Sequence, residues 1–529
     1  MNSGSVPSDS VGIFPAIRKK SLLGTIIVVL LFQLYSRYAA APATDFVSDG
    51  WSSLSIAQQA KSYAAIFSLA AKEADRPLTQ AAIPATFRFL GDRPALFALL
   101  SALVFSLALL TAMAMVYLLT DSCLGALLFG IIFSVVPNLT ESFYWAHQVP
   151  IAYMLWAYVA CGLFWLLFLK HHKPIFLVLS AAAYALGLFS YEVGVLIPVS
   201  FLVLNSTISR RKMAAAMLPF AGALGLYLLW RLGLLFGVKS HIVNGRDYLA
   251  GSWSPGIAYW NVKQILSWWV DGHMINCLRN GFNGFAEMGK RTQRFLFLGD
   301  VAAVVLLARL IRHQAAESRP VPTVEAGRVI IFGLAWAIMG HSTNLISWTA
   351  GRLNYLPAIG VSIACAGLLM CCKADKWMPY FGTLVFVCLL GVQGTAFQWR
   401  EAGAFQRKLY DFVKAHQADW STSSIVCFET AALRQRLTPD LFPVREDSSA
   451  WACYGNAGLL RGFAVNAMLR LAKPGGPGPE GILDVECGAH VEGDDLVWHE
   501  RYDPGKPHKT SMAHVYVVDC LAAGSGQAK

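Results

Sequence analysis

The sequence predicts an all-α polytopic membrane protein of about eleven transmembrane helices, with a small α/β domain on the extracytoplasmic side at its C-terminal end. Three observations carry this prediction. The 529 residues are 56% hydrophobic and only 14% charged, unlike a soluble protein. Apolar runs long enough to cross a hydrocarbon core of about 30 Å recur between residues 21 and 398. From Arg400 onward, charged residues and Pro/Gly clusters replace them.

Each apolar run defines one expected span, and the stretches between spans define the domains. Residues 1–20 form a cytosolic N-terminus, and residues 21–398 form the transmembrane domain with two long outer loops at 39–94 and 238–293. Residues 399–529 form the soluble domain, with strand-like runs at Ser424–Cys427 and His514–Val518. We expect the spans near 21–38, 95–119, 123–139, 150–169, 174–190, 193–208, 214–237, 294–311, 328–346, 355–372 and 378–398.

Basic residues lie in short clusters at every second loop, which predicts the orientation of the chain. Basic loops stay in the cytosol, so the N-terminus is expected inside, and the loop after Tyr38 and the C-terminal domain outside, in the periplasm of a bacterial inner membrane. The net charge of +11 is not arranged as a basic stripe with interleaved aromatic residues, so no nucleic acid partner is expected. The clusters are Arg18 to Lys20, Lys170 to Lys173, Arg210 to Lys212, Arg309 with Arg312 and Arg319, and Lys373 with Lys376.

Both long outer loops carry signals of the membrane surface. The first includes a plausible interfacial helix around Leu54–Ala71, and the second, residues 238–293, is rich in Trp and Tyr. Such aromatic density favours the membrane interface, or alternatively a sugar-binding wall. Four cysteines of the C-terminal domain would form two disulfides in an oxidising compartment.

Two carboxylates directly follow the first span, in the run Thr-Asp45-Phe-Val-Ser-Asp49-Gly-Trp. If this stretch is helical, Asp45 and Asp49 share a face, and their mutual repulsion would raise the pKa of one of them. A carboxylate tuned in this way can serve as a general base. The alternative is that one of these acids merely caps a loop helix.

Further charged groups are expected at the same outer side. Glu141 and His147 follow the third span, and Glu192 interrupts two apolar runs, where a lone acid requires either a function or a partner. Arg352 lies in another outer turn, where it could bind a phosphate or extend toward the lipid interface. Arg231 and Asp300 lie at similar predicted depth, which predicts a structural ion pair.

Three stretches together resemble the GT-C class, the polytopic glycosyltransferases that use polyprenyl-phosphate sugars. The run Leu124 to Pro137 followed by Glu141 and Trp145 resembles the third-span region of that class. The stretch Leu188 to Pro198 looks like its acidic turn, and Gly351-Arg352-Leu-Asn-Tyr355-Leu-Pro357 looks like its Arg-x-x-Tyr-Leu-Pro element, as in the protein O-mannosyltransferase-like group. The class often has adjacent acids in the first outer loop, whereas three residues separate Asp45 from Asp49 in this chain.

The resemblance implies an enzyme that moves a hexose or pentose from a polyprenyl phosphate to an acceptor hydroxyl on a glycan, lipid or protein. Asp49 would be the base, with Asp45 second, and Arg352 with Tyr355 would bind the donor phosphate. Glu141, His147 and Glu192 would orient the acceptor or the loop that carries the base. Direct displacement inverts the sugar and requires no metal, and the lipid-linked sugar is a substrate, so no cofactor is expected.

Three other classes compete with this interpretation: a lipid-linked glycan transporter or flippase, a polysaccharide polymerase or ligase, and a non-catalytic scaffold. A transporter is expected to place ionisable groups near the bilayer midplane and often shows internal repeats. Here the acids follow helix ends and no repeat is evident. This favours a glycosyltransferase that takes part in glycan biosynthesis in the cell envelope. A polymerase shares the same donor and face, so this alternative stays open.

Overall fold

The computed structural model describes most of the transmembrane region and parts of the C-terminal region. The described residues are 16–46, 49–70, 76–139, 143–149, 152–207, 209–232, 234, 255–270, 272–317, 323–345, 354–416, 425–429, 462–472, 481–483, 490–500, 503–511 and 515–519.

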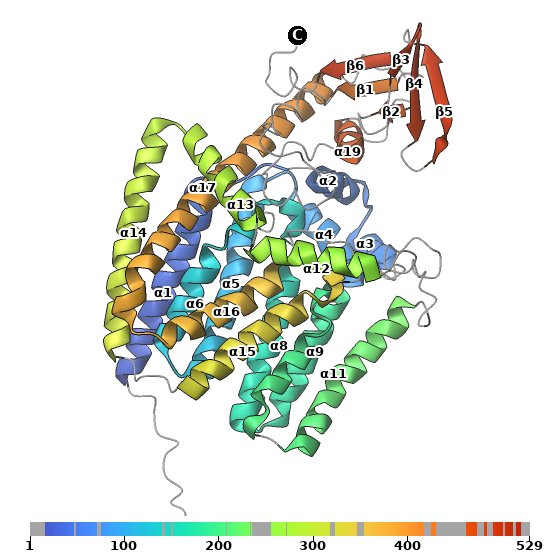
Figure 1. Ribbon diagram of the computed structural model, residues 1–529. Helices are drawn as coiled ribbons and strands as arrows, with labels where there is room; N and C mark the ends of the chain where they lie inside the picture. Colours follow the sequence, from blue (N-terminus) through green and yellow to red (C-terminus); the bar gives the residue numbers. More distant parts are fainter. Residues whose placement is uncertain are drawn as a thin grey trace, which may run out of the picture.

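Helices side by side form the body of the molecule (Figure 1). Four of them, α5, α8, α11 and α17, are long and apolar enough to cross a membrane, and shorter apolar helices lie among them. The main helices of the body are α1 (Ala16–Tyr38), α5 (Pro94–Thr120), α6 (Cys123–Ser134), α8 (Ala152–His171), α9 (Pro174–Ser190), α11 (Arg210–Arg231), α14 (Lys290–Glu317), α15 (Thr323–Gly340), α16 (Tyr355–Met370) and α17 (Ala374–His416).

These helices follow the apolar runs of the sequence closely. Ten of the eleven expected spans coincide with one helix each, and the run 174–190 coincides with α9 at both ends. The run 193–208 differs, because it is divided into the short α10 (Ile197–Ser200) and the 3₁₀ segments η3 (Glu192–Gly194) and η4 (Phe201–Thr207). Pro198 lies in the first turn of α10, where its missing N–H costs no hydrogen bond.

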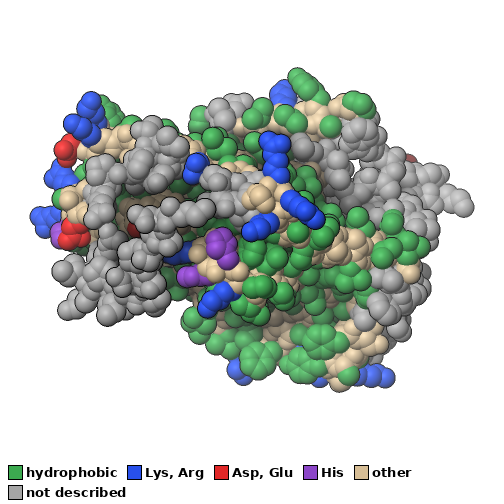
Figure 2. Space-filling view, turned by 90° about the horizontal axis from the view of Figure 1, so that it is seen from below, with side chains coloured by type: hydrophobic (Ala, Val, Ile, Leu, Met, Phe, Trp, Pro, Cys, Tyr) green, Lys and Arg blue, Asp and Glu red, His purple; other side chains and the backbone are tan. Residues whose placement is uncertain are grey.

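Basic side chains gather at the end of the body where α1 begins, which we call the lower end. Figure 2 shows this end, with Lys, Arg and His side chains among hydrophobic ones. The loops after α8 and after α16 and the first turn of α11 carry exposed basic residues, as the sequence predicts. The opposite, upper end, where α1 ends at Tyr38, carries α17's last turns and the strands (Figure 1).

Short helices cover the upper end. The first outer loop forms α2 (Asp49–Gln59), α3 (Tyr63–Ala70) and α4 (Pro77–Leu90), and α3 and α4 leave Phe67 and Phe89 exposed. The second forms α12 (Pro255–Val270) and α13 (Gly272–Glu287), which run across the body (Figure 1). Exposed apolar side chains on α12 and α13, such as Tyr259 and Ile275, fit the membrane-interface interpretation of this loop.

The helix α17 joins the body to the C-terminal region. Its 43 residues extend for about 65 Å at 1.5 Å per residue, about twice the thickness of a hydrocarbon core. The compositional change at Arg400 therefore falls inside α17 rather than at its end. Leu409 and Val413 are fully buried in this extension, so the extension is packed against other elements and is not a free linker.

Two small sheets and one helix make up the described C-terminal part. The sheet β2-β1-β6 is parallel and the sheet β3-β4-β5 is antiparallel, with Gly493 at positive φ in the β3–β4 turn. The two predicted strands are confirmed as β1 and β6. The elements are β1 (Ile425–Glu429), α19 (Gly462–Ala472), β2 (Gly481–Leu483), β3 (His490–Glu492), β4 (Asp495–Glu500), β5 (Asp503–Ser511) and β6 (Val515–Asp519). The predicted disulfides involve side chains outside the described part of the chain.

The helix α19 packs on α2 and on α17. Met468 is fully buried and belongs to the same hydrophobic cluster as Trp51 and Leu54 of α2. The C-terminal region thus contributes to the packing of the helix that begins at Asp49.

Candidate functional site at the upper end

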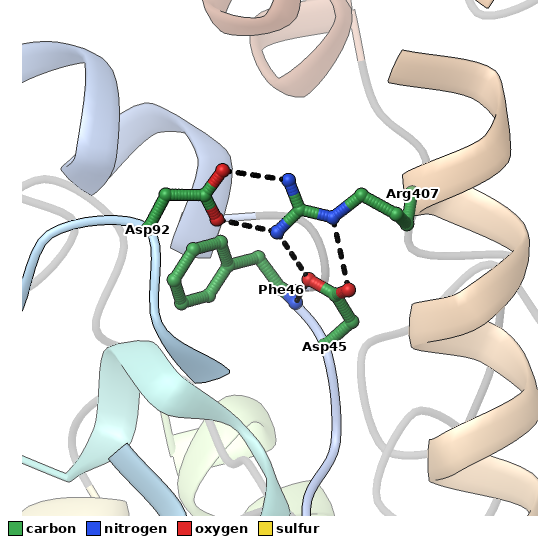
Figure 3. A network of polar contacts seen from close by, with 4 residues as sticks. All are labelled: Asp45, Phe46, Asp92 and Arg407. Atoms are coloured by element: carbon green, nitrogen blue, oxygen red, sulfur yellow. Dashed lines mark hydrogen bonds and ion pairs between the residues drawn. The ribbon is translucent and has the colours of Figure 1, made fainter. Parts of the chain in front are cut away.

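One arginine joins two carboxylates at the upper end (Figure 3). Arg407 of α17 donates from Nε to Asp45 Oδ2 at 2.9 Å and from Nη2 to Asp45 Oδ1 at 2.7 Å. Its Nη1 donates to Asp92 Oδ2 at 2.8 Å. Asp45 follows α1, and Asp92 lies in the link between α4 and α5. Three segments far apart in the sequence therefore meet at this guanidinium group.

The spacing of residues along α17 explains why Asp45 lies here. Gly403 and Arg407 are four residues apart, so they share one face of the helix. A Cβ added at Gly403 would lie 2.8 Å from the backbone nitrogen of Asp45 and 2.9 Å from its carbonyl oxygen. Glycine is thus required for the backbone of Asp45 to lie against α17, where Arg407 can reach both carboxylate oxygens.

The expected helical pairing of Asp45 with Asp49 is wrong. Asp45 lies in an irregular stretch before α2, whereas Asp49 is the first residue of that helix, so the two residues do not belong to one helix. The backbone N–H of Phe46 donates to Asp45 Oδ1 at 2.8 Å, and Arg407 supplies the opposite charge. The side chain of Asp49 lies outside the described residues.

An aromatic cluster fixes the chain on both sides of Asp49. Phe46 and Trp51 are fully buried and their rings meet edge to face, with centroids 5.7 Å apart. The Trp51 ring also lies 4.9 Å from that of Tyr410, and the Arg407 guanidinium lies 4.8 Å from the Trp51 ring centre. The backbone around Asp49 is therefore held in place before and after that residue.

His147 also reaches the helix that begins at Asp49. It belongs to the 3₁₀ segment η2 (Ala146–Gln148), and its Nδ1 lies 2.9 Å from Ser53 Oγ of α2. The structure thus brings His147 together with α2. Glu141 lies outside the described residues.

Glu192 has a charged partner. Arg76 donates from Nε to Glu192 Oε2 at 2.9 Å and from Nη2 to Oε1 at 2.8 Å, and its guanidinium lies over the ring of Tyr191. Burial acts to raise the pKa of the Glu192 carboxyl, but the charges of Arg76 and Arg231 and the hydrogen bonds of Arg76 outweigh burial and lower it. Glu192 is therefore an ionised, structurally paired carboxylate.

The predicted ion pair between Arg231 and Asp300 is wrong. Asp300 Oδ1 accepts hydrogen bonds from the Tyr35 hydroxyl of α1 and from Gln393 Nε2 of α17, both at 2.8 Å. Arg231 is close enough to Glu192 to affect its carboxyl instead. The prediction rests on the similar depth expected for the two residues in the membrane. A shared depth does not determine which helices are neighbours.

The structure describes one of the two residues that we expect to bind the donor phosphate. Arg352 lies outside the described residues. Tyr355 begins α16, is 2% exposed, and packs its ring 6.0 Å from that of Phe105. Tyr355 therefore contributes to the core, three residues after Arg352 in the chain.

Sequence reasoning missed Arg407, Asp92 and Arg76. One feature of the sequence could have identified Arg407. A helix that continues past residue 398 places Gly403 and Arg407 on one face. Among the described residues, no group of three or more His, Cys, Asp or Glu side chains is placed to hold a metal ion. Comparison with protein-family models and with curated proteins gave no match.

Proposed function

We propose that the chain is a membrane glycosyltransferase of eleven spans that moves a sugar from a polyprenyl phosphate to an acceptor hydroxyl, with inversion of the sugar. The upper end is the extracytoplasmic face, because the exposed basic loops gather at the lower end. The strands and α19 then form a small α/β domain in the periplasm of a bacterial inner membrane.

The anchoring of the chain around Asp49 is the observation that carries this proposal. Arg407 holds Asp45 before it, and Trp51 and Ser53 are fixed by Tyr410 and His147 after it. A general base works only when its position is fixed relative to the reacting atom. Both oxygens of Asp45 already accept from Arg407, which makes Asp45 a poor base and leaves that role to Asp49.

The other predicted residues take supporting roles in this proposal. Arg352 stabilises the charge on the leaving lipid phosphate, and Tyr355 supports the loop that carries Arg352. His147 positions α2 through Ser53. Glu192 holds Arg76 at the start of α4, and Glu141 contacts the acceptor. The packing of α19 on α2 would let the C-terminal domain help to select the acceptor.

Mass spectrometry of envelope glycans and glycoproteins tests this proposal. Cells carry wild type, a deletion, Asp49→Asn, or Asp92→Asn as a matched control of equal charge change in the same outer region. We expect the deletion and Asp49→Asn to lose one specific sugar, and Asp92→Asn to retain it. If Asp49→Asn matches wild type at equal protein level while the deletion changes the profile, Asp49 is not the base and transfer loses its support.

One observation favours transport of a lipid-linked glycan as a second candidate. Asp300 is fully buried between helices of the body and is held by Tyr35 and Gln393. A buried carboxyl inside a membrane bundle is a frequent feature of transport pathways. If Asp300→Asn abolishes the product while Asp49→Asn does not, transport or flipping becomes the better proposal. Polymerisation or ligation would instead appear as a change in glycan length.

A further inference from the structure

Arg37 is a fully buried cation in the last turn of α1. Its Nη2 donates to the carbonyl of Val136 at 2.9 Å, and its guanidinium lies 4.4 Å from the ring centre of Phe143. Within the described part of the chain, its Nε and Nη1 have no hydrogen-bond partner. Three of the five N–H donors of this guanidinium are therefore unsatisfied.

Among the residues that the structure describes, the groups around Arg37 supply no compensating charge. The ionisable side chains that face it are Tyr38, Tyr144 and Cys388, which are neutral at pH 7. Arg76 and Arg407 differ, because each forms an ion pair with a carboxylate. A buried, unpaired charge costs several kcal/mol, so Arg37 requires an anion.

We propose that Arg37 binds the phosphate of the polyprenyl donor. This inference rests on the proposed function and deepens it. Arg37 lies at the upper end of α1, the depth at which a lipid phosphate resides, and it precedes Asp45 by only eight residues. The planar guanidinium offers its free N–H groups to phosphate oxygens. Because Arg37 is fully buried, binding requires side chains that cover it, such as that of Phe143, to shift.

Ligand-induced thermal stabilisation tests this assignment. The purified full-length protein in phosphatidylcholine nanodiscs is titrated with polyprenyl monophosphate, with the neutral polyprenol of the same length, and with inorganic phosphate. The variants are Arg37→Gln, Arg37→Lys and Arg93→Gln, the last a matched control because Arg93 is an exposed upper-end arginine. We expect the monophosphate alone to raise the Tm of wild type and of Arg93→Gln.

Loss of charge-assisted hydrogen bonds predicts about tenfold to hundredfold weaker binding of the monophosphate to Arg37→Gln. Arg37→Lys keeps the charge and is expected to bind with intermediate affinity. Wild-type affinity in Arg37→Gln would overturn the assignment while the lipid-phosphate donor stands. No response of wild type to the monophosphate would overturn the donor class as well. An equal shift with inorganic phosphate would overturn the lipid assignment.

An internal counter-ion is the alternative to a bound phosphate. Glu141 belongs to residues 140–142, outside the described part and adjacent to Phe143 in the chain. If Arg37→Gln and Glu141→Gln each lower the Tm but the double variant recovers it, the two side chains form a pair and the proposal fails. The phosphate site is supported if the Tm losses of Arg37→Gln and Glu141→Gln are independent of each other and only the Arg37 variants bind the monophosphate more weakly.

Discussion

Replacement of Arg407 by glutamine would leave two carboxylates without their shared cation. The Arg407 and Asp45 side chains are each 22% exposed, whereas that of Asp92 is 40% exposed. Exposed pairs contribute about 0 to 1 kcal/mol, and removal of one partner from a buried pair costs about 3 to 5 kcal/mol. The bidentate pair with Asp45 lies between these limits, so we expect a coupling of about 2 kcal/mol. For Asp92 we expect less than about 1 kcal/mol.

Double-mutant cycles separate these two couplings from the stacking of Arg407 on Trp51. The free energy of unfolding is measured by equilibrium denaturation in mixed micelles for Arg407→Gln, Asp45→Asn, Asp92→Asn and the two double variants. The stacking is lost equally in every variant without Arg407, so it cancels in the cycle. Added salt should weaken the Asp92 coupling more than the Asp45 coupling, because exposed charges are screened more effectively.

Arg400→Gln is the matched control on the same helix. The Arg400 side chain is 41% exposed and its partner Glu401 is 57% exposed, so we expect a loss below about 0.5 kcal/mol. A coupling to Asp92 equal to or larger than that to Asp45, or no coupling to Asp45, would refute the reasoning from burial and geometry.

Two further predictions concern the packing and the pH dependence of the upper end. Gly403→Ala should lower the unfolding free energy by about 1 to 3 kcal/mol, because its Cβ would overlap the backbone of Asp45. Gly382→Ala, whose Cβ would meet its nearest atom at 3.4 Å, should be neutral or slightly stabilising by the same denaturation assay. Arg76 lowers the pKa of Glu192 below its ordinary 4.5, so this pair stabilises the fold at neutral pH and the stabilisation is lost as pH falls through the lowered pKa. In Arg76→Gln, burial alone favours the protonated carboxyl, so the variant should be less stable at pH 7 by about 2 to 3 kcal/mol. Melting curves at several pH values should show its deficit shrinking on acidification, and a deficit independent of pH would contradict this assignment.

The helices of the body could be predicted from sequence because each depends on a local property. A run of apolar residues bounded by charge forms a helix in a bilayer whatever its neighbours are, and α9 coincides with its predicted run at both ends. The divided run after Glu192 was missed because hydropathy does not distinguish an α-helix from 3₁₀ turns. The extension of α17 to His416 was missed because its polar surface resembles that of a soluble domain.

The charged partners of the site could not be predicted, because they depend on which helices are neighbours. Asp45 and Arg407 are 362 residues apart in the chain, and Arg76 and Glu192 are 116 apart. Nothing local in the sequence specifies these pairs. For Glu192, the sequence left function and structural pairing equally open, and the bidentate contact with Arg76 favours pairing.

These partners change how the two acids of the first outer loop have to be tested. Asp45→Asn removes charge from the ion pair with Arg407, so it should lower stability, and a loss of product in this variant can follow from a displaced loop. Arg407→Gln displaces the same loop without changing either acid, so it should reproduce the defect of Asp45→Asn. Asp49→Asn should instead lose the product without matching either variant in stability. This separation distinguishes a base from a residue that only holds the base in place.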